Sequence, residues 1–196
     1  MTETPDLAAL IGSRICHDLI SPIGAIGNGV ELLLMEGASK SPEIALIADS
    51  VTHANARIRF FRVAFGAASQ GQRIGAPEVT GILSDMMRGG RLSVAWDGPA
   101  DLPRAEVKLA FLALMCLESA MPFGGRISVV AEGWRITAQA AKLRLDPALW
   151  GPLARSEAPA EVGPAQVQFA LLPDQAGRLG RVLGVKTGDE VVTIGF

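Results

Sequence analysis

One histidine stands among residues that suit nucleophilic chemistry on phosphorus. His17 is followed directly by Asp18, and Ser21 comes four residues later, immediately before Pro22. A neutral imidazole is a good nucleophile near pH 7, and a neighbouring carboxylate can fix its tautomer or take the departing proton. On a helix, residues four apart share a face, so the Ser21 hydroxyl would lie beside the imidazole. We therefore identify His17, Asp18 and Ser21 as the candidate catalytic residues.

The element that carries these residues is predicted to be one long amphipathic helix ending near Glu36. Its apolar residues recur with alternating gaps of four and three, at Ile15, Leu19, Pro22, Ile26, Val30 and Leu33. This spacing is typical of a helix packed lengthwise against partner helices, and we call these six residues the predicted seam. At about 100° per residue, His17 lies roughly 160–200° from Ile15 and Leu19. We expect its imidazole to face outward.

A line of small or polar residues runs along the helix from the histidine and could receive a docking protein. The predicted docking residues are Arg14, Ile20, Gly24, Asn28 and Glu31. Glycine inside a helix costs about 1 kcal/mol relative to alanine, so a glycine such as Gly24 favours close approach by another helix or protein. Asn28 and Glu31 could equally be the solvated face of the helix. The pattern leaves both interpretations open.

A second helix is predicted from Glu43 to Phe65, after a turn over residues 37–42. It repeats the apolar spacing at Ile44, Ile47, Val51, Ala54, Ile58, Phe61 and Phe65. Two such helices joined by a short loop form an antiparallel hairpin, which cannot close a core alone. The simplest completion is a second copy, which gives a four-helix bundle with two-fold symmetry. We therefore expect a homodimer formed through the hairpin.

Other polar residues of the second helix are weaker candidates for function. His53 lies off the apolar face of this helix, but no acid and no Ser-Pro pair follow it, so we interpret it as a solvated side chain. Three arginines, Arg57, Arg59 and Arg62, could either meet an acidic partner or solvate the bundle. The sequence does not separate these alternatives.

Composition excludes several classes of protein. The 196 residues carry a formal net charge of −2 without a basic cluster, which argues against nucleic acid as the main partner. The two cysteines, Cys16 and Cys116, form neither a disulfide framework nor a metal site. We expect no uninterrupted apolar run long enough to span a bilayer and no signal peptide. The sequence is typical of a soluble, cytoplasmic protein with no membrane partner.

The pattern changes after a linker that begins at Gly66. We predict helices over residues 77–88, 103–120, 146–154 and 166–183, and strands over residues 92–96, 126–132, 135–139, 185–186 and 191–194. Helices interleaved with antiparallel hairpins favour a two-layer α/β sandwich. The predicted fold class is α+β, with a helical-hairpin dimerisation domain over residues 1–70 and the sandwich over residues 71–196.

The segment from His17 to Pro22 resembles the H-box of two-component histidine kinases, in which an acid follows the phosphoacceptor and a Thr/Ser/Asn-Pro pair lies one turn later. The longer run from Cys16 to Leu33 is closer to the alphaproteobacterial histidine phosphotransferases of the ChpT type. The second half is similar in layout to the ATP-binding domain of histidine kinases. That domain needs an asparagine on its long helix, where this chain has Glu118, and a downstream Asp-x-Gly-x-Gly, which Gly177, Gly180 and Gly184 do not form. We expect a degenerate domain without a nucleotide site.

The resemblance implies a phosphorelay in which His17 accepts a phosphoryl group from the phosphoaspartate of a receiver domain and passes it to response regulators. The donor would be the receiver of a hybrid sensor kinase, and the receiver would supply Mg²⁺, so no stably bound cofactor is expected. Two other classes stay open: an ATP-dependent histidine kinase, and a non-catalytic dimeric scaffold that binds receivers.

Overall fold

A computed structural model describes residues 7–35 and 41–196; of residues 7–11, 13, 14 and 18 it describes only the backbone. The chain divides into two compact units. The first is Met1–Ala67 with Gly81–Met86, and the second is Ala68–Thr80 with Met87–Phe196. Helix α3 (Ala76–Met87) is thus shared between the units, which no pattern in the sequence indicates.

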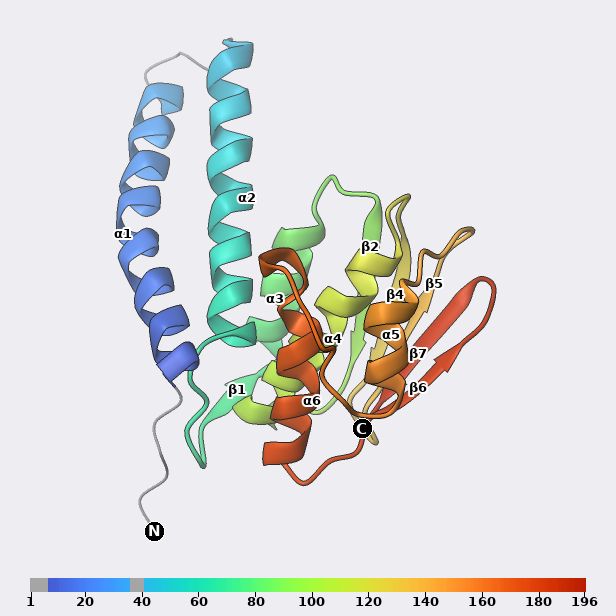
Figure 1. Ribbon diagram of the computed structural model, residues 1–196. Helices are drawn as coiled ribbons and strands as arrows, with labels where there is room; N and C mark the ends of the chain where they lie inside the picture. The colour runs from blue at the N-terminus through green and yellow to red at the C-terminus, as the bar shows by residue number, and fades with distance from the viewer. Residues whose placement is uncertain (1–6, 36–40) are drawn as a thin grey trace. The chain divides into compact units, whose positions relative to one another are not determined.

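The first unit is built on two long antiparallel helices, α1 (Leu7–Met35) and α2 (Pro42–Ala64), seen side by side in Figure 1. The hydroxyl of Ser41 caps α2 by accepting a hydrogen bond from the Ile44 N–H at 3.4 Å, and Pro42 occupies the first turn. Both helices were expected from the apolar spacing, and α1 continues through Pro22 without a break. Gly81–Met86 joins this unit through an ion pair of 3.0 Å between Arg59 Nη1 and Asp85 Oδ2.

The second unit contains a mixed five-stranded sheet. In spatial order its strands are β2 (Leu92–Asp97), β4 (Gly125–Val130), β5 (Arg135–Gln139), β7 (Val191–Gly195) and β6 (Gly184–Thr187). Strands β2 and β4 are parallel, and the other neighbours are antiparallel. A separate short pair joins β1 (Arg73–Gly75) to β3 (Asp101–Pro103). The sequence patterns predicted the five strands of the sheet but neither member of this short pair.

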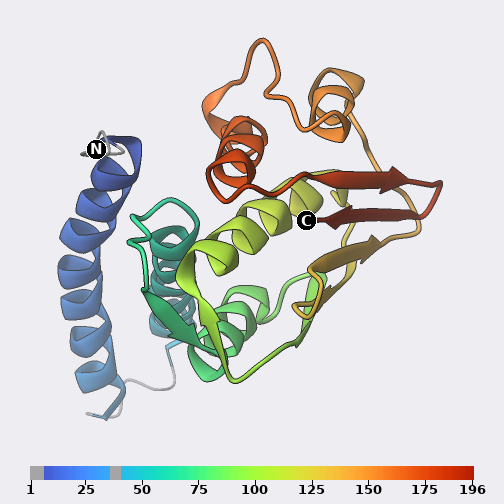
Figure 2. The ribbon, with the colours of Figure 1, turned by 90° about the horizontal axis from the view of Figure 1, so that it is seen from below.

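One face of the sheet is buried and the other is exposed. Ile127, Ile136, Val192 and Ile194 point to the buried face, where α4 (Arg104–Ala120) lies along the strands (Figure 2). The alternate residues, such as Arg126 and Arg135, are exposed. This alternation is typical of a sheet with helices on one side only. The expected α+β class is confirmed, and the second unit holds a sheet of five strands.

The core of the second unit is centred on α4. Most of its side chains are fully buried, among them Leu109, Phe111, Leu112, Leu114 and Leu117. Helix α6 (Gln168–Arg178) packs against it and buries Phe169 and Leu172, while the short α5 (Pro147–Ala154) buries Trp150 beside Phe169. Helix α4 is surrounded by other elements of the unit, so apolar residues occur on all its faces. This explains the strongly apolar run of its sequence.

Helix α6 is shorter than predicted. The sequence pattern placed its end at Leu183, but the helix ends at Arg178 and Gly180 adopts a φ of +63°. The N–H of Arg181 donates to the Ala176 carbonyl at 2.9 Å and the N–H of Gly180 donates to the Gly177 carbonyl at 3.0 Å, which together form a Schellman motif. The left-handed glycine therefore stops the helix before the apolar periodicity ends.

Candidate functional site

His17 lies on an exposed face of α1, as its distance from the predicted seam indicated. The residue before it, Cys16, is buried with 6% of its surface exposed. Because consecutive residues turn by about 100° around a helix, burying Cys16 turns His17 to the side of the hairpin rather than into it. The imidazole is thus presented on the flank of the first unit.

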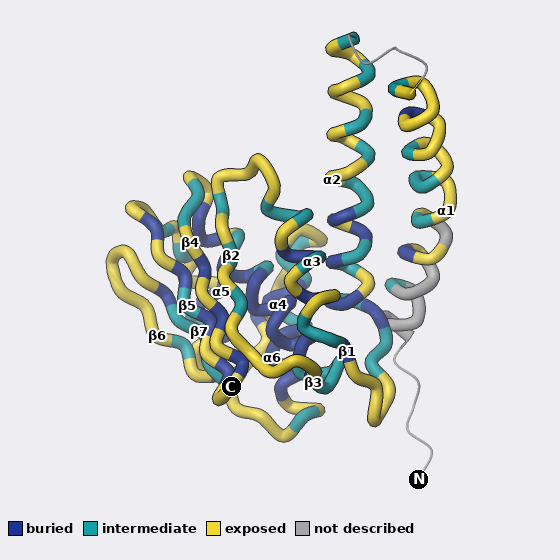
Figure 3. The backbone as a smooth tube through the Cα atoms, turned by 180° about the vertical axis from the view of Figure 1, so that it is seen from behind, coloured by how far each residue is buried: buried dark blue, intermediate teal, exposed yellow. Residues whose placement is uncertain are grey.

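Three lengthwise surfaces of α1 follow from the burial of its residues, which Figure 3 shows along the backbone. The first surface faces α2. It includes the buried Cys16 and Val30 and the half-buried Ile20, Ile23, Gly27 and Leu34. A Cβ placed on Gly27 would lie 3.3 Å from Val51 Cγ1, which shows how closely α2 approaches here.

The second surface, which we call the apolar flank, consists of Ile15, Leu19, Ile26 and Leu33. These side chains are 53%, 44%, 53% and 47% exposed. They are members of the predicted seam, which was expected to pack against partner helices of a bundle, and within the chain they stay largely uncovered. The α2 contact instead uses a neighbouring stripe that shares only Val30 with it. Both stripes have helical spacing, and the sequence pattern gave more weight to the larger side chains.

The third surface, which we call the histidine flank, carries His17 and the exposed residues Ser21, Asn28 and Glu31, with the half-buried Gly24 among them. A Cβ on Gly24 would meet no atom within 4 Å, so the surface is open at that point. Ile20, the other predicted docking residue whose side chain is described, belongs to the surface facing α2. The structure thus brings Ser21, Gly24, Asn28 and Glu31 onto one face with His17. The side chains of Arg14 and Asp18 lie outside the described residues.

The structure separates the three arginines of α2. Arg57 places its guanidinium 5.7 Å from the centre of the Phe61 ring. Arg59 forms the ion pair with Asp85. Arg62 is exposed and lies close enough to Cys16 to act on that thiol: burial raises the pKa of Cys16, and the positive charge of Arg62 partly offsets the rise. The sequence treated the three as one group, because the partner of each depends on tertiary contacts.

The glycines of the second unit do not form a phosphate-binding loop. Gly180 ends α6 and Gly184 begins β6, so these two glycines belong to a helix-to-strand turn. Glu118, at the place where the resemblance would require an asparagine, is half-buried on α4. The absence of nucleotide binding stays a prediction.

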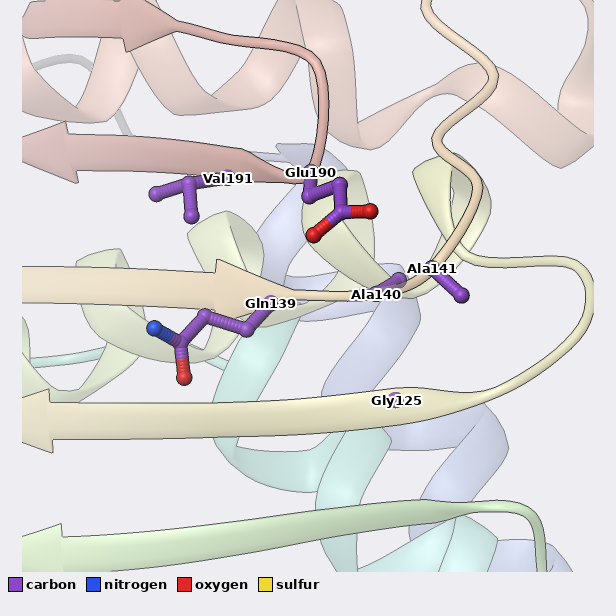
Figure 4. Close-up of a pocket in the computed structure, with 6 residues that line it drawn as sticks. All are labelled: Gly125, Gln139, Ala140, Ala141, Glu190 and Val191. Carbon is purple, nitrogen blue, oxygen red and sulfur yellow. The ribbon is translucent and has the colours of Figure 1, made fainter.

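A shallow, open depression lies at one end of the sheet (Figure 4). Its lining residues are Gly125, Gln139, Ala140, Ala141, Glu190 and Val191. Glu190 is the one ionisable side chain in this lining, and an acid repels phosphate. Among the residues whose side chains the structure describes, no group of three or more His, Cys, Asp or Glu residues is placed to hold a metal ion.

Residues Ile15–Met35 of α1 are long and apolar enough to cross a membrane by length and composition, with a mean hydropathy of 1.2. The sequence analysis expected no uninterrupted apolar run of this length. This stretch is interrupted by the polar residues His17, Asp18, Asn28 and Glu31. Little of this stretch is buried, because the described residues leave the apolar flank uncovered.

Comparison with known proteins gives the family. Residues 76–191 match the model of the histidine phosphotransferase C-terminal domain. The chain is 41% identical over 150 residues to the protein phosphotransferase ChpT of Brucella abortus, with 72% of this chain and 71% of that protein covered. A solved structure described as a bacterial phosphotransferase aligns with a TM-score of 0.68 and 33% identity, covering 99% of this chain and 97% of the other. Together with the exposed histidine on α1, these matches show that the chain belongs to the histidine phosphotransferase family and is a phosphotransferase of two-component signalling.

Proposed function

We propose that His17 accepts a phosphoryl group from the phosphoaspartate of a receiver domain and returns it to the aspartate of a second receiver. The observation that carries this proposal is the exposure of His17 on a flank that also offers Ser21, Gly24, Asn28 and Glu31. A receiver could approach this face without displacing any residue that holds α1 against α2. The first receiver would be that of a hybrid sensor kinase, and the second that of a response regulator.

The transfer needs positioning and charge neutralisation more than covalent machinery. The imidazole Nε2 attacks phosphorus in line, an N–P bond forms, and the P–O bond to the aspartate carboxylate breaks. Because Nδ1 keeps its proton during the attack, the phosphorylated ring is positively charged. The charge disappears when the phosphoryl group leaves or when the Nδ1 proton is lost. Asp18, next to His17 in the sequence, would orient the ring, and Ser21 would donate a hydrogen bond to a phosphoryl oxygen. The receiver would supply Mg²⁺, which neutralises the phosphoryl oxygens.

A single incubation tests the role of His17. Purified chain is mixed with a receiver domain carrying radiolabelled phosphoaspartate, and acid-labile, base-stable label on the chain is measured. We expect label on the wild type and on His53→Ala, the matched control for the other histidine, and none on His17→Ala. Label that persists on His17→Ala would remove His17 from the mechanism. A receiver that binds without any transfer to the wild type would support the scaffold alternative.

We also propose that the chain is a homodimer through a four-helix bundle made by two α1–α2 hairpins. The support is the apolar flank of α1, together with Leu46 and Ile47 of α2, which are 68% and 47% exposed. Apolar side chains in a continuous line of this kind are typical of an interface. Their burial against a second copy would also explain an apolar α1 in a cytoplasmic protein.

The dimer is tested by light scattering at micromolar concentration, where we expect twice the chain mass of 20.5 kDa. Ile26→Asp, on the apolar flank, should give monomers, because a charge would be buried in the interface. Asn28→Asp, a charge on the histidine flank, should leave the dimer intact. A wild type of monomer mass would refute the bundle.

The second unit is proposed to serve as a further docking surface or as a stabiliser of the bundle, without binding nucleotide. Radiolabelled ATP in equilibrium dialysis should not be retained by the wild type. Retention or hydrolysis of ATP would favour the histidine-kinase alternative.

A further inference from the structure

The register of the hairpin places one arginine beside the candidate phosphoacceptor. A Cβ on Gly12 would lie 3.2 Å from the Phe65 Cβ, and one on Gly27 would lie 3.3 Å from Val51 Cγ1. The two helices are antiparallel, so residues of α1 between these contacts stand opposite residues of α2 taken in reverse order (Figure 1). Counting inward from the Gly12–Phe65 contact brings His17 level with the turn of α2 that contains Arg62.

The flank on which Arg62 lies follows from helix geometry. Ile58 is buried and stands seven residues after Val51, so both belong to the face of α2 that meets α1. Arg62 is rotated by about 40° from Ile58, and His17 is rotated in the same direction by about 100° from the buried Cys16. In an antiparallel pair of helices, residues rotated in the same sense from the contact line lie on the same flank. Arg62 therefore lies on the same side of the hairpin as the histidine flank of α1. Arg57 is rotated in the opposite sense and lies on the other side.

The contacts of the other two arginines agree with this assignment. Arg57 lies over the Phe61 ring, and Arg59 is held by the carboxylate of Asp85 at 3.0 Å. Arg62 is exposed, and its charge acts on Cys16, the residue immediately before His17. Of these three cations, Arg62 is the one placed to reach a group bound to the imidazole.

We propose that Arg62 contacts the phosphoryl group carried by His17 and neutralises its charge, an inference that rests on the proposed phosphotransfer role of His17. A phosphoryl group at neutral pH carries between one and two negative charges and several strong acceptor oxygens. A guanidinium donates paired hydrogen bonds to such oxygens and stays protonated, so it neither gains nor loses a proton during transfer. In the transition state, negative charge on the transferring oxygens is stabilised by the same contact.

The test separates this contact from receiver docking by omitting the receiver. The chain is phosphorylated with potassium phosphoramidate, whose P–N bond breaks with loss of ammonia as the N–P bond to His17 forms. Two readouts are the ³¹P chemical shift of the phosphohistidine across pH and the first-order rate at which His17 is phosphorylated. The variants are Arg62→Gln, Arg62→Lys and the matched control Arg57→Gln, each checked by circular dichroism for an intact fold.

We expect Arg62→Gln to move the ³¹P titration to higher pH and to slow phosphorylation of His17 by about tenfold, because a cation that stabilises the charged phosphoryl group is lost. Arg62→Lys should restore most of the rate, which a merely structural role of the guanidinium would not do, and Arg57→Gln should match the wild type. Arg62→Gln with a wild-type titration and rate would overturn the proposal, even if transfer from a receiver were impaired. If Arg62→Gln does not fold, Arg62→Met replaces it, because methionine also removes the charge and is expected to cause the same shift of the ³¹P titration and the same loss of rate. Failure of the wild type to be labelled at His17 would refute the proposed function instead.

Discussion

Trp134 donates its indole N–H to Glu106 Oε2 at 2.8 Å, and the second oxygen of the same carboxylate accepts a hydrogen bond from Arg181 Nη2 at 2.8 Å. The indole is 2% exposed, and its ring stacks on Phe196 with centres 5.2 Å apart. One carboxylate at the start of α4 therefore ties the β4–β5 turn to the segment that follows α6. This link lies within the second unit and involves neither the histidine nor its flank.

Replacing this carboxylate should destabilise the second unit. Glu106→Gln keeps the shape of the side chain but removes its charge. The glutamine amide has one acceptor oxygen, so it can accept from Trp134 or from Arg181 but not from both through separate oxygens. We expect the free energy of unfolding to fall by about 1–3 kcal/mol. Urea unfolding followed by tryptophan fluorescence measures it. Glu132→Gln, an exposed acid in the β4–β5 turn, is the control and should change stability by less than about 0.5 kcal/mol. Equal stability of the two variants would contradict the role of Glu106.

Two glycines with left-handed backbone should respond differently to alanine. Gly124 has a φ of +93°, and a Cβ there would lie 2.4 Å from the Arg91 carbonyl oxygen. Gly133 has a φ of +75° with no atom within 4 Å of the added carbon. Gly133→Ala should cost about 1–2 kcal/mol from backbone strain alone. Gly124→Ala should cost more, because the contact is with backbone that cannot move away. Thermal unfolding measures the loss of stability in each variant. A larger loss for Gly133→Ala than for Gly124→Ala would contradict the close contact between Gly124 and the Arg91 carbonyl.

Two glycines of α1 form a second matched pair. A Cβ on Gly24 meets open space, so Gly24→Ala should raise the stability of the hairpin by about 0.5–1 kcal/mol through helix propensity. Gly27→Leu should lower it, because the side chain would push Val51 and α2 away. The change in melting temperature followed by helical circular dichroism distinguishes the two. A Gly27→Leu protein as stable as the wild type would show that α1 and α2 are not in contact at Val51.

Burial raises the pKa of the Cys116 thiol well above its ordinary value of 9.0, which makes stability depend on pH. The folded protein keeps this thiol protonated at a pH where the unfolded chain ionises it. The protonated thiol therefore makes its full contribution to the free energy of unfolding below pH 9. Above pH 9 this contribution falls by up to about 1.4 kcal/mol for each pH unit. Between pH 8 and pH 10 the wild type should lose more stability than Cys116→Ala. Parallel losses in the two proteins would rule out Cys116 as the cause.

Much of the fold could be predicted from local patterns. The cap at Ser41, the glycines after α3 and the hairpin around Gly133 each mark an end or a turn through the chemistry of one or two residues. The pairs β1–β3 and β2–β4 could not be predicted in this way. Each joins strands that are distant in the sequence, and a three-residue strand such as Arg73–Gly75 has no recognisable period.

The outward placement of His17 could be predicted from the sequence, but its surroundings could not. The periodicity of the apolar residues predicted that His17 faces outward. If α1 had only one apolar stripe, the sequence would also have shown which face of α1 contacts α2. Helix α1 has two such stripes, one with Cys16 and one with Ile15, and spacing alone does not say which meets α2. The arginines of α2 show the same limit, because the partners Phe61 and Asp85 and the proximity of Cys16 depend on how the helices pack.

The separation of α1 into three lengthwise surfaces has a consequence for how such proteins diverge. Substitutions on one surface leave the other two unchanged, so if receivers dock on the histidine flank, as we propose, a lineage can exchange its signalling partners by altering that flank while its hairpin continues to fold. Conversely, if the apolar flank forms the proposed dimer, changes in its large side chains can prevent mixed dimers of two duplicated copies without changing what either copy recognises.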